Sequence, residues 1–535
     1  MRDELNQSAV LAMYDVRGIQ SYIFRTNEVR EIIGASNIVD DIVIKALNSI
    51  RDVWSKEKGT DGSPKIDASK YLTDWQHEDA SRFDKEPEIQ MQVIFIGGGN
   101  AYVLFRTGEE CGKWNRALGK YVLENTYSLQ LAVAAVKKTE SYKNDYAAIQ
   151  EEMIRVKASM PAGRPAGALP FMQTDPMTGF PLHKLDENNK KYGAYLSEES
   201  LLKCKARQKE GGDENIHDNL VTEKGTESLL AVVHIDGNNM GNRIIEIMRG
   251  KNTYEEAAET IQTISRSIVD GFGEAYKKMC EYIDTDLKLK VKKASSKTRD
   301  ILIRRIILAG DDITFICNAR VAIPAVRQFF EVLSGKCLYY EQNKMNENQE
   351  KAEQVRITDL QRYALSACAG IAFCNSHFPF SDAYQVAEAC CSSAKSVAKE
   401  STSRDGHGNI GNFLDFQMCT NVSAADLKKY RTKHYYKVGG GTLIRRPYYV
   451  GCKDQNKCSN INEVNQARSI ENLIASVKEF KPLPRSQAKA LREACAKGDT
   501  ILDGYCDFLA SRQKEPKTDR AFWYDALEII DFYVE

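Results

Sequence analysis

The sequence predicts an α+β protein in which one β-α-β-β-α-β unit occurs twice. Two apolar runs end in aspartates at matching positions, Asp15 and Asp236. Each run is followed further along the chain by a strand, a tight turn and a second strand. Helical sequence lies between these markers and after them in both copies. Internal repetition of this kind indicates two related structural modules.

The first copy is predicted over residues 1–138. Its opening strand lies in "AVLAMYDVRGIQSYIF" (9–24), and its hairpin is "QVIFIGGGNAYVLF" (92–105). β-Branched and aromatic residues flank the glycines, as expected for two strands joined by a tight turn. A helix is predicted over 111–127, and a last strand over 129–138.

The second copy is predicted over residues 229–420. It opens with "LLAVVHIDGNNMGNRI" (229–244), and apolar residues between Ala257 and Met279 recur every three or four positions, which indicates one helix. The hairpin "RIILAGDDITFICN" (305–318) aligns with that of the first copy, so that Gly99 matches Asp311 and Asn100 matches Asp312. A helix (321–335), a strand (363–375) and a further helix (383–400) follow.

Two other segments complete the plan. Residues 139–228 are polar and are predicted to form a helical and irregular insertion, and residues 421–535 a small helical domain. The formal net charge is zero, with 74 basic and 74 acidic residues, so the overall charge does not demand a nucleic-acid or membrane partner. No signal peptide and no membrane-spanning run is apparent, and the scattered cysteines suggest reduced thiols in a cytoplasmic protein.

The order β-α-β-β-α-β is the ferredoxin-like arrangement, in which strand one lies beside the hairpin. Asp236 is therefore expected to face Asp311 and Asp312. Carboxylates that converge repel one another unless a cation neutralises them. Mg²⁺ (or Mn²⁺) bound to Asp236, Asp311 and Asp312 would suit nucleotidyl transfer, in which metal ions assist a hydroxyl and a triphosphate.

Small and basic residues near these carboxylates fit a nucleoside triphosphate. Backbone near Gly237, Asn238, Asn239 and Gly241 could approach phosphates, as could the turn at Gly310. Lys395 and Lys399 lie one helical turn apart, and either could reach a phosphate. The first copy has Gly98, Gly99 and Asn100 instead of acids, which predicts a non-catalytic module that serves as a scaffold or shapes a second nucleotide pocket.

Each feature also has a purely structural explanation. Gly-Asp is common in turns, and lysines on a helix most often face solvent. The repeat favours a metal site, because three carboxylates are predicted to meet in one copy only.

The motifs resemble the large polymerase-cyclase subunit of type III CRISPR effector complexes. "DVRGIQSYIFRTNEVREIIGASNIVDDI" (15–42) is similar to its first palm domain, and "HIDGNNMG" and "LAGDDI" to its second, whose tip is usually GGDD. "AYQVAEACCSSAKSVAKE" (383–400) is similar to a helix that this family shares with GGDEF diguanylate cyclases. "PLPRSQAKAL" (482–491) resembles the opening of the family's C-terminal helical domain.

The resemblance implies two palm domains with ATP between them, and Mg²⁺-dependent synthesis of cyclic oligoadenylates as antiviral second messengers. It assigns Asp236, Asp311 and Asp312 to the metal, Gly310 to the turn and Lys395 to the phosphates. Nucleoside triphosphates are the implied ligands, with other effector subunits and guide or target RNA as further partners. No membrane partner is implied, and the oligomeric state stays open.

Three departures from the family pattern bear on this expectation. Ala309 replaces the first glycine of the tip, and no His-Asp pair precedes the first palm domain. The insertion at 139–228 contains a single cysteine, Cys204. We therefore expect neither an HD nuclease domain nor a four-cysteine zinc site in this sequence. This pattern suits a compact, stand-alone relative in a defence system without a guide RNA, or a variant that works with a reduced effector complex. Two alternatives remain: a non-catalytic nucleotide-binding scaffold of an RNA-guided complex, and a diguanylate-type cyclase.

Overall fold

A computed structural model of the protein describes most of the chain. The described residues are 6–26, 28–58, 64–79, 81–97, 99–160, 169–185, 195–208, 229–294, 302–338, 364–400, 409–419, 426–451 and 463–534.

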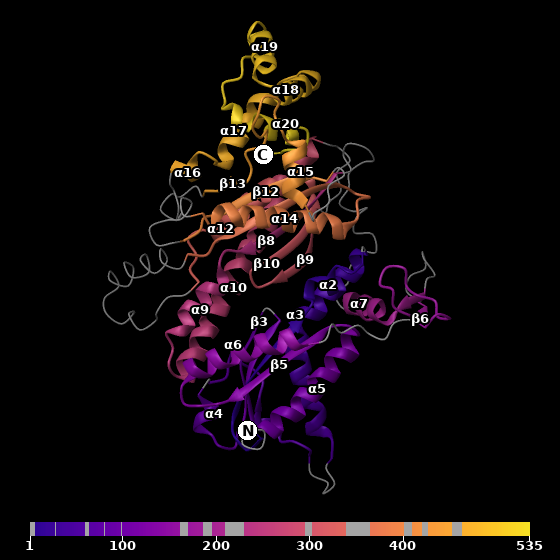
Figure 1. Ribbon diagram of the computed structural model, residues 1–535, viewed down its shortest axis with the longest axis vertical. Helices are drawn as coiled ribbons and strands as arrows, with labels where there is room; N and C mark the ends of the chain where they lie inside the picture. The colour runs from indigo at the N-terminus through magenta and orange to yellow at the C-terminus, as the bar shows by residue number, and fades with distance from the viewer. Residues whose placement is uncertain are drawn as a thin grey trace, which may run out of the picture. The chain divides into compact units, whose positions relative to one another are not determined.

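Contacts divide the chain into two compact units. The first comprises Met1–Glu214 and Met240–Arg266, and the second comprises Asn215–Asn239 and Ser267–Glu535. Helix α10 (Tyr254–Tyr282) contributes residues to both units. Figure 1 labels many of the elements of each unit.

The first unit is built on a five-stranded sheet with the order β2-β3-β4-β1-β5. Its strands are β1 (Val10–Arg17), β2 (Tyr71–Leu72), β3 (Met91–Gly97), β4 (Asn100–Phe105) and β5 (Gln130–Lys137). Strand β1 pairs antiparallel with both β4 and β5, so the four main strands follow the ferredoxin-like order. The short strand β2 adds parallel to β3 at the edge.

Helices of the first unit bury the apolar faces of this sheet. Helix α6 (Tyr142–Ser159) packs on β5 and β1, whereas α3 (Val29–Lys56) and α5 (Gly108–Thr126) contact each other. A core cluster also takes in residues of α9 (Met240–Arg249) and of the start of α10. The shorter elements are α2 (Ile19–Ile23), η1 (Ala68–Lys70), α4 (Arg82–Lys85), β6 (Leu182–Leu185), β7 (Tyr195–Ser197) and α7 (Glu198–Gln208).

The second unit contains a six-stranded sheet with the order β13-β12-β11-β8-β10-β9. Its strands are β8 (Leu229–Gly237), β9 (Ile303–Ala309), β10 (Asp312–Asn318), β11 (Ala367–Asn375), β12 (Phe413–Met418) and β13 (Tyr448–Tyr449). The strands β11-β8-β10-β9 repeat the order of the first sheet, and β12 adds parallel to β11. Both ferredoxin-like modules predicted from the sequence are therefore confirmed.

Helices cover both faces of the second sheet. On one face, α12 (Ala319–Leu333) packs with α10, and Tyr276 of α10 lies edge-on to Phe315 of β10. On the other face, α14 (Phe380–Ala398) crosses β11, β8 and β12 (Figure 1). A Cβ atom added to Gly370 of β11 would lie 1.9 Å from the carbonyl oxygen of Ala387, so this glycine permits the close approach of α14.

The C-terminal helices belong to the same compact unit as the second sheet. They are α15 (Leu427–His434), α16 (Glu463–Gln466), α17 (Ile470–Phe480), α18 (Arg485–Lys497), α19 (Asp499–Ala510), η7 (Arg520–Phe522) and α20 (Trp523–Ile529), while η2 (Ile283–Leu287) and α11 (Lys288–Ala294) precede β9. The buried guanidinium of Arg446 donates a 2.8 Å hydrogen bond to Glu528 of α20 and lies 4.4 Å from the ring of Phe416 on β12. Buried polar and aromatic contacts thus join the helical segment to the sheet.

The domain boundaries predicted at 138, 228 and 420 stay predictions, and the contacts group the chain differently. Helix α6, which follows residue 138, packs on the first sheet. None of the helices in the described ranges is both long and apolar enough to cross a membrane. The cysteines within those ranges are all free thiols.

Candidate active site

The candidate site is built on the direct pairing of two aspartates in the second sheet. Asp236 at the end of β8 stands opposite Asp312 at the start of β10. Directly opposed residues of antiparallel strands project to the same face, with Cβ atoms about 4.5–5.5 Å apart. Gly310 and Asp311 form the turn between Ala309 and Asp312, which are paired. Gly310 has φ +62°, whereas Ala309 is the last residue of β9, so alanine replaces glycine where no left-handed backbone is needed.

Helix α14 supplies a cation to this pair. The Nζ of Lys395 lies 2.5 Å from Oδ2 of Asp236 and donates a 3.0 Å hydrogen bond to the carbonyl oxygen of Gly237. Burial alone would lower the pKa of Lys395, but the Asp236 carboxylate outweighs it and raises the pKa. Of the two lysines considered from the sequence, Lys395 is the one that contacts a predicted site carboxylate.

The surroundings of Asp311 and Asp312 disfavour the ionised form of their carboxyl groups. Burial, followed by repulsion from Asp236, raises the pKa of Asp311 to about 6. Burial, followed by repulsion from Asp236 and Asp311, raises the pKa of Asp312 to about 8. Oδ1 of Asp312 is buried and accepts no hydrogen bond. An acidic group of this kind is a strong candidate for a cation ligand or a functional group.

The sequence analysis missed His234 and Thr314, which lie on the same strands as Asp236 and Asp312. Nδ1 of buried His234 lies 3.2 Å from the hydroxyl oxygen of Thr314 and 3.4 Å from Oδ1 of Asp312. Burial lowers the pKa of His234 to about 4, so the imidazole is neutral at pH 7. His234 and Thr314 each lie two residues from a site aspartate, and the period of two in a strand could have revealed them.

One stripe of α14 faces the same region. Tyr384 lies edge-on to His234 with ring centroids 5.5 Å apart, and Glu388 contributes to the raised pKa of Asp312. Tyr384, Glu388, Cys391 and Lys395 follow the helical spacing of three or four. Helical spacing back from Lys395 was the signal that could have predicted Glu388.

The segment after Asp236 forms a compact turn. The N–H of Asn238 donates to the carbonyl of Ser366, and its side-chain amide donates to Ser366 and Gly411. Asn239 has φ +57°, a left-handed conformation that asparagine tolerates better than most residues. The N–H groups of Asn238 therefore stabilise the turn, whereas its Oδ1 is buried and accepts no hydrogen bond. Gly241 lies near the start of α9, and a Cβ added there would meet no atom within 4 Å.

The first unit has the same framework with different chemistry. Asp15 stands opposite Asn100, as Asp236 stands opposite Asp312, which confirms the predicted alignment of the two tips. Lys157 of α6 lies 2.5 Å from Asp15 and so repeats the pairing of Lys395 with Asp236. Gly99 has φ +79°, and Gly98 lies outside the described residues.

The site fits a divalent cation only in part. Among the described residues, no three His, Cys, Asp or Glu side chains are placed to hold a metal ion together. The three carboxylates expected to converge are thus not arranged as a complete set of ligands, and Asp236 contacts Lys395. Mg²⁺ needs only one or two carboxylates when a phosphate supplies further oxygens. Asp312, with its buried free oxygen, and the opposed Asp236 meet that lesser requirement.

Comparison with known proteins identifies part of the chain. Residues 229–406 match the family model described as Cas10/Cmr2, second palm domain. The match confirms, for this part of the chain, the resemblance stated from the sequence. No curated protein matches the chain.

Solved structures of Csm1–Csm4 cassettes align with the chain at low similarity. For the complex with one ATP, the TM-score is 0.43 and the identity 12%, with 99% of this chain and 70% of the other covered. For the complexes with cA4 and with AMPPNP, the TM-score is 0.42, with identities of 13% and 11%. These alignments cover 99% and 98% of this chain and 70% and 69% of the others. The fold itself follows from the strand order and register described above.

Proposed function

We propose that this chain, whose residues 229–406 match the second palm domain of Cas10/Cmr2, is a nucleotidyltransferase that joins nucleoside triphosphates into cyclic oligonucleotides. ATP is the proposed substrate and cyclic oligoadenylate the proposed product, a second messenger in CRISPR-type antiviral defence. The observation that carries the proposal is the pairing of Asp236 with Asp312 beside Lys395, within the palm domain that the family model matches.

The chain's own residues would act by binding and orientation. Asp236 and Asp312, with Asp311 at the turn, would hold Mg²⁺ or Mn²⁺ together with the triphosphate. When bound, the metal would lower the pKa of the attacking 3′-hydroxyl and stabilise charge on the phosphates and leaving pyrophosphate. Lys395 would turn from Asp236 to the phosphates, which offer more negative charge. Because Gly237 and Gly310 have no side chain, the nucleotide could approach their backbone closely.

His234 and Thr314 would orient the carboxylate of Asp312. His234 is neutral at pH 7, and its Nδ1 lies 3.4 Å from Oδ1 of Asp312, which accepts no hydrogen bond in this structure. A closer approach would let the imidazole donate a hydrogen bond to this carboxylate without adding a positive charge. We assign no general base among the described side chains. The proton of the 3′-hydroxyl would pass to bound water or to a substrate phosphate.

A non-catalytic nucleotide-binding scaffold is the second candidate. The ion pair between Asp236 and Lys395 favours it, because a neutralised Asp236 is already satisfied without a metal ion. A diguanylate-type cyclase would use GTP at the same carboxylates, so it is tested by the choice of nucleotide.

The decisive experiment is incubation of the purified chain with each labelled nucleoside triphosphate and Mg²⁺ or Mn²⁺. Activating RNA and candidate effector subunits are added in separate arms. We expect a cyclic product from ATP, and at least about a 100-fold loss in the Asp311→Ala/Asp312→Ala variant, as for removal of groups that stabilise a transition state. Chromatography and mass spectrometry identify the product.

The matched control is Asp507→Ala, which removes an exposed carboxylate on α19 and should leave product formation unchanged. A cyclic dinucleotide from GTP would establish the diguanylate alternative. Saturable ATP binding without product in every arm would establish the scaffold.

Partners and cellular location are also proposals. We propose nucleoside triphosphates as ligands, and other CRISPR effector subunits with guide or target RNA as assembly partners. The cytoplasm is the proposed location, where such substrates are abundant.

A further inference from the structure

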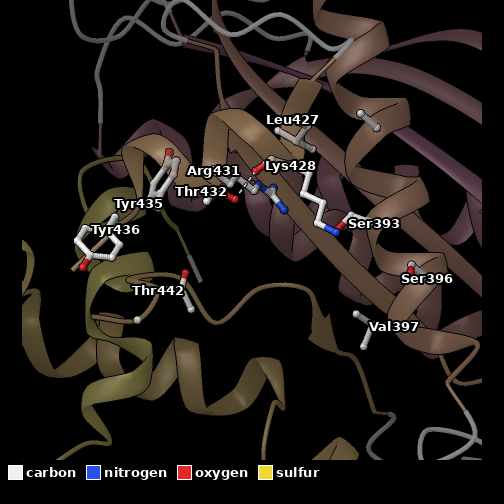
Figure 2. A pocket seen from close by; sticks show the side chains of 12 residues that line it. Ser393, Ser396, Val397, Leu427, Lys428, Arg431, Thr432, Tyr435, Tyr436 and Thr442 are labelled. Atoms are coloured by element: carbon white, nitrogen blue, oxygen red, sulfur yellow. Dashed lines mark hydrogen bonds between the residues drawn. The ribbon is translucent and has the colours of Figure 1, made fainter. Parts of the chain in front are cut away.

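A groove in the second unit lies between α14, α15 and the loop that follows α15. Figure 2 shows Lys428 reaching from α15 toward Ser393 of α14, with Tyr436 and Thr442 at the other end. The cavity has a volume of about 710 Å³, within the range of small-molecule sites. Its lining residues are Ala389, Ser393, Ser396, Val397, Leu427, Lys428, Arg431, Thr432, Tyr435, Tyr436, Gly441 and Thr442.

The groove is distinct from the candidate active site, although both use α14. Ala389, Ser393, Ser396 and Val397 form one stripe of this helix at helical spacing. Lys395, on another stripe, contacts Asp236. One helix therefore separates the groove from the paired aspartates.

The charge of the lining is positive. Among the lining residues that the structure describes, Lys428 and Arg431 carry a charge and none carries a carboxylate. Buried Asp415 neutralises Arg431 through hydrogen bonds of 2.8 and 2.9 Å. Exposed Lys428 forms no ion pair with any residue in the described ranges, so its charge can attract an anion.

Polar and aromatic groups surround this charge. The hydroxyls of Ser393 and Ser396 can donate hydrogen bonds to phosphate or ribose oxygens. Those of Thr432 and Thr442 already donate to the carbonyl oxygens of Lys428 and Ile444. Tyr436 is 55% exposed, whereas the hydroxyl of its neighbour Tyr435 is held by Glu528. The exposed ring of Tyr436 can therefore stack on a base.

The loop beyond Tyr436 leaves space at the rim. Gly439, Gly440 and Gly441 have φ values of +94°, +114° and +97°, a conformation that residues with a side chain adopt rarely. A Cβ at any of them would meet no atom within 4 Å, so backbone conformation rather than crowding accounts for the glycines. Bare backbone at a rim allows a ligand to approach closely.

We propose that this groove binds a nucleoside phosphate, with the phosphate at Lys428 and the hydroxyls of Ser393 and Ser396, and with the base against Tyr436. Two sources share this chemistry: a free nucleotide and one nucleotide of a single-stranded RNA. The proposal does not depend on catalysis at Asp236 and Asp312.

The test uses the full chain carrying Asp236→Ala/Asp312→Ala, in EDTA, so that metal-dependent binding at the candidate active site is removed. One arm uses 8-azido-ATP, and the other a fluorescent single-stranded RNA that contains 4-thiouridine. Anisotropy or filter binding gives the affinity, and peptide mass spectrometry locates the photo-crosslinks.

We expect saturable binding of at least one probe, with crosslinks in residues 389–397 or 427–442. Lys428→Glu should weaken binding about tenfold, as for loss of a charge-assisted contact. Tyr436→Ala should also weaken binding, because the stacking contact with the base is lost. Lys489→Glu, which changes an exposed lysine on α18, should leave the affinity unchanged within about twofold.

The preferred probe identifies the source of the nucleotide. Binding of 8-azido-ATP alone indicates a free nucleotide, and tighter binding of RNA indicates a strand. The proposal is overturned if neither probe binds, if crosslinks map elsewhere, or if Lys428→Glu and Tyr436→Ala both retain full affinity.

Discussion

At the scale of single residues, the chemistry of the candidate site depends on the burial of Asp311 and Asp312 beside Asp236. Asp312 is placed opposite Asp236, with one oxygen buried and free of hydrogen bonds. Repulsion and burial raise the pKa values of Asp311 and Asp312 to about 6 and about 8. Without a cation, both groups therefore oppose folding once they ionise.

This arrangement predicts how stability varies with pH in the absence of divalent cations. A carboxyl whose folded pKa is raised above the unfolded value binds its proton more tightly in the folded state. Stability should fall as the pH rises from about 4 to about 8, and should level off above the pKa of Asp312. Asp312→Asn removes most of this dependence and should raise the melting temperature at pH 8 by about 1–3 °C.

The measurement is thermal unfolding in EDTA at several pH values, with Asp507→Asn as the control. Added Mg²⁺ with ATP should stabilise wild type more at pH 8 than at pH 5.5, because the cation binds the ionised carboxylates. A wild type and an Asp312→Asn variant with parallel pH profiles would contradict this prediction.

At the scale of elements, α14 determines the geometry of the site. Its inner stripe brings Tyr384, Glu388 and Lys395 to the strands, and its close packing on β11 depends on Gly370. A Cβ at Gly370 would lie 2.4 Å from the amide nitrogen of Cys391 as well as 1.9 Å from the oxygen of Ala387. Backbone cannot yield as the end of a flexible side chain can, so the helix would have to move.

We therefore predict that Gly370→Ala destabilises the second unit by about 1–3 kcal/mol, the usual cost of overpacking. It should also reduce ATP binding, because Lys395 moves with the helix. Chemical denaturation and ATP titration measure the two effects.

Gly504→Ala provides the control, because a Cβ at this helical position of α19 meets no atom within 4 Å. It should stabilise the protein by up to about 1 kcal/mol. Equal stability of Gly370→Ala and wild type would show that α14 does not rest on this contact.

At the scale of the whole molecule, the C-terminal helices are integral to the second unit. Asp525 of α20 accepts hydrogen bonds from the backbone N–H groups of Arg445 and Arg446 and from the hydroxyl of Tyr448 on β13. Arg446 in turn bonds to Glu528, and its guanidinium lies 4.9 Å from the ring of Tyr435. The side chains of Arg446 and Asp525 are fully buried, so each depends on the other charged groups for compensation.

Removing one member of this network should destabilise the whole unit. Asp525→Ala leaves the buried Arg446 guanidinium with Glu528 alone among the two carboxylates and removes the acceptor of the Tyr448 hydroxyl, and we predict a loss of about 3–5 kcal/mol. Hydrogen exchange should then accelerate in β8 and β11 as well as in α17 and α20, because sheet and helices unfold together. Asp531→Ala, which breaks an exposed pair with Arg485, should cost no more than about 1 kcal/mol. Faster exchange confined to the helices would show that they form an independent domain.

The sequence by itself determined the repeated β-α-β-β-α-β plan and the pairing of its tips. Asp15 opposite Asn100 and Asp236 opposite Asp312 follow from strand alternation and the short turns, which are local properties of the chain. The apolar stripe of α10 and the hairpin glycines are likewise visible in short windows of sequence.

Only the tertiary structure decided which distant side chains reach these tips. Lys395 rather than Lys399 contacts Asp236, and His234 and Glu388 join the site, because the close packing of α14 on β11 sets the rotation of that helix. Tertiary packing also forms the groove beside α15 and joins the C-terminal helices to the sheet. Each depends on contacts between residues far apart in the chain, and local periodicity carries no information about such contacts.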